Sequence, residues 1–221
     1  MPLHSALLSL SSLLLLPLAA LAQPPAPARP VISLEPEAVV ASGCTPRGRV
    51  VWFGVAREIS EHAATIVRRE EILTDDDGDG TVRFELGREV PFQSIWVAVD
   101  LENGAWTAAT PEGFPLREFS LPGRGAVRGQ GRPDWIETTR GYVHLLVVRP
   151  GQGAWGFRAG DGGAGDDDGE SNGVLAASLA RLRGVGASPA APERFDPRDL
   201  WIVVDPTRME ISVRQIAEGA P

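Results

Sequence analysis

The stretch Thr81-Val82-Arg83-Phe84-Glu85-Leu86 alternates between apolar and charged side chains. Successive side chains of an extended strand point to opposite faces, so Val82, Phe84 and Leu86 share one face and the two charged residues the other. The pattern is typical of a strand with one buried and one solvated face, and it predicts β structure for the chain around it.

Short β-like runs lie on both sides of this strand. Turn signals separate them at Thr45–Gly48, Asp75–Gly80 and Glu102–Gly104, where Gly, Pro, Asn and Asp gather. Several short strands within about 80 residues are typical of an antiparallel sandwich. The predicted runs before residue 112 are Val31–Leu34, Arg49–Ala56, Ala64–Arg69, Thr81–Leu86, Ser94–Asp100 and Ala105–Thr110.

Beyond Pro111–Pro115 the chain predicts more strands and one helix. The helix is expected at Val174–Arg183, where Leu175, Leu179 and Leu182 share a face at helical spacing. The predicted strands are Leu116–Leu121, Trp135–Thr138, Tyr142–Arg149, Ala154–Ala159, Leu200–Val204 and Met209–Ile216, the last two forming a hairpin.

Two segments carry a family resemblance. The opening of bacterial Ig-like domains, Gly-x-x-Pro-x-Gly-x-x-Val, resembles the stretch Ser42-Gly43-Cys44-Thr45-Pro46-Arg47-Gly48-Arg49-Val50-Val51-Trp52. A hairpin of these domains is similar to Leu73–Phe84. The resemblance covers roughly residues 31–112 and implies a sandwich used for spacing or adhesion, with no catalytic residues. We therefore expect a mainly β protein: an Ig-like sandwich over 31–112, then a β-rich domain over 115–221 that contains the one helix.

The first 22 residues predict export. An apolar run that includes Leu13–Leu16 ends at Ala20-Leu21-Ala22, the small-x-small pattern that a signal peptidase cleaves, so Gln23 is the expected mature N-terminus. A Pro-rich leader follows over residues 23–30. No later stretch reaches about 18 continuous apolar residues, so no membrane span is expected.

Composition excludes several classes of chemistry. All 21 basic residues are Arg, so Schiff-base catalysis, a Walker-type phosphate lysine and a Ser-Lys dyad are excluded. A net charge of −8 makes nucleic acid a poor partner. The single Cys44 permits no internal disulfide, and it is either a buried small hydrophobe or a thiol free to pair between chains.

No catalytic constellation is visible along the sequence. His62 lies in a polar segment, and His144 lies in an apolar run that favours a partly buried strand histidine. Their spacing gives no zinc site. There is no Gly-x-Ser-x-Gly elbow, and Cys44 has no evident catalytic partner.

Two acidic loops are the only metal signals. Asp75, Asp77 and Asp79 match the first half of a Ca²⁺ loop, but Leu86 stands where the bidentate carboxylate is required. A second loop, Asp161–Gly173, has the same deficiency. We expect no cofactor, with Ca²⁺ at Asp75/Asp77/Asp79 as the alternative to an Asp-Gly turn.

Trp52 and Trp96 are the candidate interface residues. Ile95, Val97 and Val99 form a uniform apolar face, and so do Val51, Phe53 and Val55, which leaves both indoles on the opposite faces. A large indole is costly to leave in water. We expect residues 115–221 to cover Trp52 and Trp96; an external ligand or a different strand register are the alternatives.

These observations favour an exported, non-enzymatic binding or structural protein of the periplasm, the cell surface or the exterior, with an unknown protein or glycan as partner. A carbohydrate-binding module is the first alternative, because exposed indoles stack on sugars. A secreted hydrolase with paired carboxylates is the second.

Overall fold

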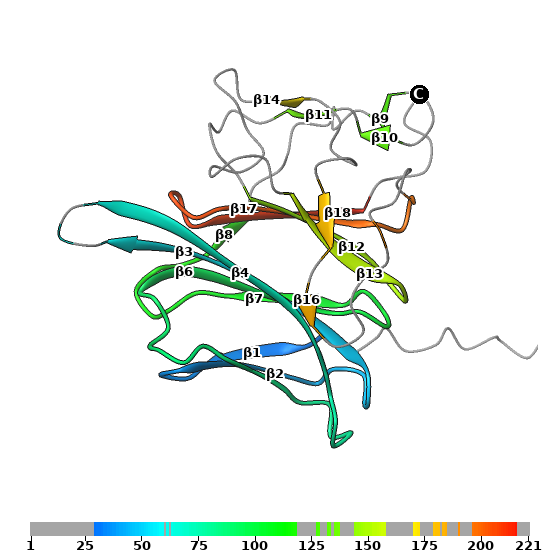
Figure 1. The fold of residues 1–221 in the computed structure, drawn as a ribbon, viewed down its shortest axis with the longest axis horizontal. Helices are drawn as coiled ribbons and strands as arrows, with labels where there is room; N and C mark the ends of the chain where they lie inside the picture. Colours follow the sequence, from blue (N-terminus) through cyan, green and yellow to red (C-terminus); the bar gives the residue numbers. More distant parts are fainter. Residues whose placement is uncertain are drawn as a thin grey trace, which may run out of the picture.

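A computed structural model of the chain describes residues 29–59, 61, 63–118, 127–128, 132–133, 135–137, 144–157, 170–172, 179–181, 183–184, 190 and 196–215. Every regular element in these residues is a β-strand. The mainly β fold class is therefore confirmed. The larger sheets stack as three layers, from the blue strands to the orange and red strands in Figure 1. The predicted signal and nearly all of the leader lie outside the described residues.

The first layer is an antiparallel sheet in the order β1-β2-β5. Its strands are β1 (Val31–Leu34), β2 (Ala38–Ser42) and β5 (Val82–Glu85). The alternation of β5 is as predicted, because Val82 and Phe84 are buried and Arg83 and Glu85 are exposed. Strand β2 was not predicted, because it is a run of small apolar residues without clear alternation.

The second layer lies in the middle, in the order β16-β4-β3-β6-β7. The pairs are antiparallel except that of β16 with β4. Because β3 pairs with β6 only as far as Arg57 opposite Gln93, the β3–β4 hairpin projects beyond its neighbours (Figure 1). The strands are β3 (Arg49–Ile59), β4 (Ala64–Thr74), β6 (Gln93–Asp100), β7 (Trp106–Ala109) and β16 (Arg183–Gly184).

The third layer is a sheet in the order β15-β13-β12-β17-β18-β8. The hairpin predicted around residues 205–208 joins β17 to β18, and there Asp205 Oδ1 accepts the amides of Thr207 and Arg208 at 3.0 Å each. Two further pairs are β9 (Val127–Arg128) with β10 (Arg132–Pro133), and β11 (Trp135–Glu137) with β14 (Glu170–Asn172). The strands of the layer are β8 (Arg117–Glu118), β12 (His144–Arg149), β13 (Gly153–Phe157), β15 (Leu179–Arg181), β17 (Leu200–Asp205) and β18 (Glu210–Gln215).

Both faces of the middle layer are buried, which explains the nearly continuous apolar runs of β3 and β6. One face, with Val51, Phe53 and Val97, packs against Leu146, Ile202 and other residues of the third layer. The opposite face, with Trp52 and Trp96, packs under the first layer. The predicted domain boundary near residues 112–115 thus separates the third layer from all of the second layer except β16. The larger core takes residues from both sides of this boundary.

The expected role of Trp52 and Trp96 is therefore wrong, although their faces were assigned correctly. The exposed fraction is 0% for Trp52 and 1% for Trp96, and the described members of their cluster all lie between Ile32 and Ala98. The rings of Trp52 and Phe84 stack with centroids 6.1 Å apart, and Trp96 tilts against Phe84 at 6.0 Å. The indoles fill the sandwich core, and the apolar set that includes Val51 seats the third layer instead.

The predicted helix at Val174–Arg183 is wrong at its described positions. Leu179–Arg181 is strand β15, which pairs with β13, and Arg183 begins β16. Three leucines at helical spacing are a weak local signal, and pairing with strand β13 overrides it. The first part of the predicted helix lies outside the described residues. No helix in the described part of the chain is long and apolar enough to cross a membrane.

Candidate binding groove

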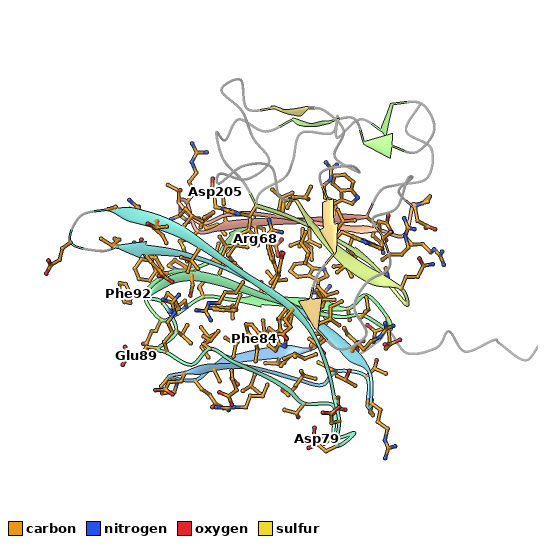
Figure 2. All side chains as sticks on the ribbon, in the orientation of Figure 1. Arg68, Asp79, Phe84, Glu89, Phe92 and Asp205 are labelled. Carbon is orange, nitrogen blue, oxygen red and sulfur yellow. The ribbon has the colours of Figure 1, made fainter. Side chains whose placement is uncertain are left out.

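An open groove of about 1120 Å³ lies at one end of the sandwich formed by the first two layers. Four segments build it: the β1–β2 turn, the end of β3, the β5–β6 loop and the chain after β7. Figure 2 shows Glu89 and Phe92 of the β5–β6 loop at this end. The lining residues are Ile32, Leu34, Glu35, Pro36, Arg57, Glu58, Ile59, Arg88, Glu89, Val90, Pro91, Phe92, Gln93, Ala109, Thr110, Pro111 and Glu112.

Backbone hydrogen bonds fix the β5–β6 loop against the β1–β2 turn. The Val90 amide donates to Pro36 O at 2.8 Å, and the Leu86 amide donates to Glu37 O at 2.9 Å. At the end of the loop, Ser94 Oγ donates to Pro91 O at 2.6 Å and accepts Trp96 Nε1 at 3.0 Å. The buried indole thus helps to hold the loop that carries Phe92.

Two large apolar side chains of the groove are open to solvent. Phe92 is 69% exposed and Ile59 is 70% exposed. Phe92 makes an edge contact with Phe114, at 4.5 Å between ring centroids and 83° between ring planes. Phe92 therefore has a neighbour on one side and remains available to a ligand on another.

The charged residues of the groove fall into paired and unpaired sets. Glu58 forms an ion pair with Arg88, and Glu35 forms one with Arg83. The described residues provide no hydrogen-bond or ion-pair partner for the other charged lining residues, which are Glu89, Glu112 and Arg57. The groove thus offers two free carboxylates and one free guanidinium.

Gln93 contributes a shielded acceptor to the same groove. Its Oε1 atom is buried and has no hydrogen-bond donor among the described residues. A buried polar atom without a partner costs free energy comparable to a lost hydrogen bond. A ligand N–H or O–H group can recover that cost only if the Gln93 side chain turns this atom toward the groove.

The three aspartates of the predicted Ca²⁺ loop do come together. One ligand oxygen from each of Asp75, Asp77 and Asp79 lies within 4.8 Å of the others. However, Asp75 Oδ2 already accepts the amides of Arg47 and Gly80 at 2.8 and 2.9 Å, and its Oδ1 accepts the Gly78 amide at 3.1 Å. The carboxylate closes a turn in the way that Asp does in Asp-Gly loops.

The pKa values of Asp75 and Asp77 shift in opposite directions. Burial by itself raises the pKa of Asp75, but the amides of Arg47, Gly80 and Gly78 outweigh it and leave that pKa lowered. A hydrogen bond with Asp75 raises the pKa of Asp77. Because both oxygens of Asp75 already accept amides, the loop offers fewer free oxygens than the six to eight that Ca²⁺ takes.

A buried polar cluster lies between the second and third layers. Arg68 Nε donates to Glu70 Oε2 at 2.8 Å, Arg68 Nη2 donates to Leu145 O at 3.1 Å, and the guanidinium lies 5.0 Å from the centroid of Phe53. Figure 2 shows Arg68 between these layers. Burial, and next the positive charge of Arg68, lower the pKa of His144 to about 4, against the opposing effect of Asp205.

Cys44 is a free, buried thiol. Burial and then the charges of Asp100 and Asp75 raise its pKa to about 12. This leaves the small-hydrophobe interpretation of Cys44 and removes a reactive thiolate at neutral pH.

The comparisons with known proteins add no relative. No family model matches the chain, and no similar protein was found among curated proteins or among solved structures.

The groove was not predicted from the sequence. Its residues come from four segments between positions 32 and 112, and none of these segments carries a motif. The one local signal is Val90-Pro91-Phe92, an apolar run next to charged residues and outside any predicted strand.

Proposed function

We propose that the chain is an exported, non-enzymatic binding protein of the cell envelope or exterior, and that the groove is its ligand site. The observation that carries the proposal is the combination of two exposed apolar side chains, Phe92 and Ile59, with the shielded and unpaired Gln93 Oε1. Small sets of polar groups placed among apolar ones are typical of ligand sites.

The order of the strands supports a binding module. Seven strands form two facing sheets, β1-β2-β5 and β4-β3-β6-β7, with the first strand at the edge of one sheet and the seventh at the edge of the other. Ig-like sandwiches have this general arrangement, and the loops at the ends of their sheets carry recognition. The resemblance of residues 31–112 to bacterial Ig-like domains is part of the proposal.

The carbohydrate-binding alternative depends on exposed indoles, and the described indoles do not provide them. Trp52, Trp96, Trp155 and Trp201 are all buried, and Trp106 is half-buried against the larger core. The side chain of Trp135 lies outside the described part of the chain. Among the described residues that line the groove, Phe92 is the aromatic side chain that a glycan ligand could stack on.

One observation favours the hydrolase alternative, because four glutamates line the groove. Two of them, Glu35 and Glu58, are held by arginines, and Glu89 and Glu112 are exposed. The acid of a glycosidase needs a sheltered, apolar setting. The groove therefore supports binding better than hydrolysis.

Site-specific photocrosslinking tests the binding site. A photoreactive phenylalanine analogue at position 92 is exposed to envelope and medium fractions of the producing bacterium, and the same analogue at Val31 is the control. Val31 is 63% exposed but does not line the groove. We expect a discrete adduct from position 92 only. Equal labelling from both positions would refute the groove as the ligand site.

Export has its own test. Protein recovered from the envelope or medium should begin at Gln23, in free or cyclised form. Recovery of chains that begin at Met1 in these fractions would refute cleavage after Ala22.

A further inference from the structure

The free charges of the groove favour a positively charged ligand. Glu89 and Glu112 have no partner among the described residues, and Arg57 is the one unpaired cation against them. The other two glutamates are already compensated by Arg83 and Arg88. An uncharged ligand would leave the excess of negative charge among these unpaired groups without a partner.

The acceptor in the groove favours a donor on the same ligand. Gln93 Oε1 requires an N–H or O–H group, and guanidinium and ammonium groups are donors only. A cation in the groove also gains from the face of an aromatic ring, and Phe92 supplies an exposed ring there. The unpaired carboxylates, the Gln93 acceptor and the Phe92 ring all favour a cation that donates hydrogen bonds.

The apolar lining requires more than an isolated cation. Ile59 and Phe92 are exposed, and Val90, Pro91 and Pro111 extend the apolar surface. Exposed apolar area of this kind is covered in complexes by apolar side chains of the partner. The ligand that satisfies both requirements is a polypeptide segment with basic and apolar side chains side by side.

From this complementarity we infer that the groove binds a segment of a partner protein in which Arg or Lys is flanked by apolar residues. The inference rests on the proposed function, because it names the ligand class of the same groove. The net charge of −8 acts in the same direction, since an acidic protein attracts basic partners over longer distances.

Selection from a random library identifies the ligand class even while the partner is unidentified. A phage-displayed random heptapeptide library is selected on the mature protein and, in parallel, on an Ile59→Ser/Phe92→Ser double variant. A glycan array is probed with both proteins. Because Ile59 and Phe92 are exposed, the variant should keep the wild-type far-UV spectrum and melting temperature. Only ligands that prefer the wild type by more than tenfold are attributed to the groove.

We expect the groove-dependent peptides to be enriched in Arg or Lys next to apolar residues. The best peptide, synthesised with a fluorophore, should bind a Glu89→Gln/Glu112→Gln variant about five- to tenfold more weakly in 50 mM NaCl, since exposed ion pairs contribute modestly. Asp76→Asn, which removes one negative charge in the turn before β5, is the control outside the groove and should leave affinity unchanged. Raising NaCl to 500 mM should weaken wild-type binding and reduce the difference between the proteins.

The outcomes separate this inference from the proposed function. Groove-dependent peptides that are acidic or uncharged, or groove-dependent binding of glycans alone, would overturn the basic segment and leave the binding site standing. Equal effects of Asp76→Asn and the double glutamate variant would also overturn it. The absence of any ligand that distinguishes the wild type from the Ile59→Ser/Phe92→Ser variant would overturn both proposals.

Discussion

Acidification is expected to destabilise the fold through His144 in particular. His144 lies in β12, whose alternate residues Leu146 and Val148 pack against the middle layer, so the imidazole points toward the same interface. Burial and the nearby Arg68 lower its pKa from 6.5 to about 4. The native state therefore holds this side chain neutral at a pH where the unfolded chain protonates it.

The sign and size of the effect follow from proton linkage. Between pH 6.5 and 4 the unfolded state binds more protons than the native state, so stability falls as the pH falls and the loss ends below the native pKa. At 1.36 kcal/mol per pKa unit the full shift corresponds to about 3 kcal/mol. Between pH 7 and pH 4.5, the part that applies is about 2.5 kcal/mol.

Urea unfolding followed by tryptophan fluorescence measures this contribution. The wild type and a His144→Gln variant, which cannot titrate at this position, are compared at pH 7 and pH 4.5. Carboxylates titrate in both proteins, so the difference between their pH dependences isolates His144. We expect the wild-type midpoint to fall by about 1 M urea more than that of the variant, for slopes typical of small proteins. Parallel pH dependences, within about 0.5 kcal/mol, would refute the reasoning.

Three further outcomes are expected. Gly54→Ala should destabilise the protein by about 1–3 kcal/mol, the cost of overpacking, because its Cβ would lie 2.2 Å from Cζ3 of the buried Trp96 ring; an unchanged urea midpoint would contradict this contact. Millimolar Ca²⁺ should leave the melting temperature unchanged, because Asp75 already accepts three amides; a saturable rise that Asp77→Ala abolishes would show a calcium site. Cys44 should not react with a thiol reagent at pH 8 until urea unfolds the chain, because its pKa is raised to about 12; rapid labelling of the native protein would show that the thiol is accessible.

The sequence predicted most strands because their signals are local. Val31–Leu34 and the alternation of Val82, Phe84 and Leu86 appear in the structure as expected, and so does the turn between β17 and β18. Strand β2 was missed because Ala38–Ser42 has no alternation, and the helix was predicted because Leu179 and its neighbours satisfy helical spacing over a short window. In both cases pairing with distant strands decides the structure.

The error at Trp52 and Trp96 has a clear physical origin. The opposite faces of β3 and β6 were assigned correctly, but both faces are apolar, so alternation alone does not show which face packs on which sheet. A strand with two apolar faces is typical of a layer that is covered on both sides. The nearly continuous apolar run Val50–Ala56 is the sequence pattern that indicates a central layer between two others. The structure buries every residue of this run.

The burial of the middle layer also explains where a ligand can bind. Because the first and third layers cover the two faces of β3 and β6, these strands offer no open face to a partner. The proposed ligand site accordingly lies at the ends of the sheets, where β3 extends past its pairing with β6 at Arg57 and where Pro111 follows β7 without an amide to donate. The side chains next to these points, Ile59 and Phe92, are exposed although they are large and apolar. The same three-layer packing that buries Trp52 and Trp96 thus leaves exposed apolar side chains at the groove, which is the proposed ligand site.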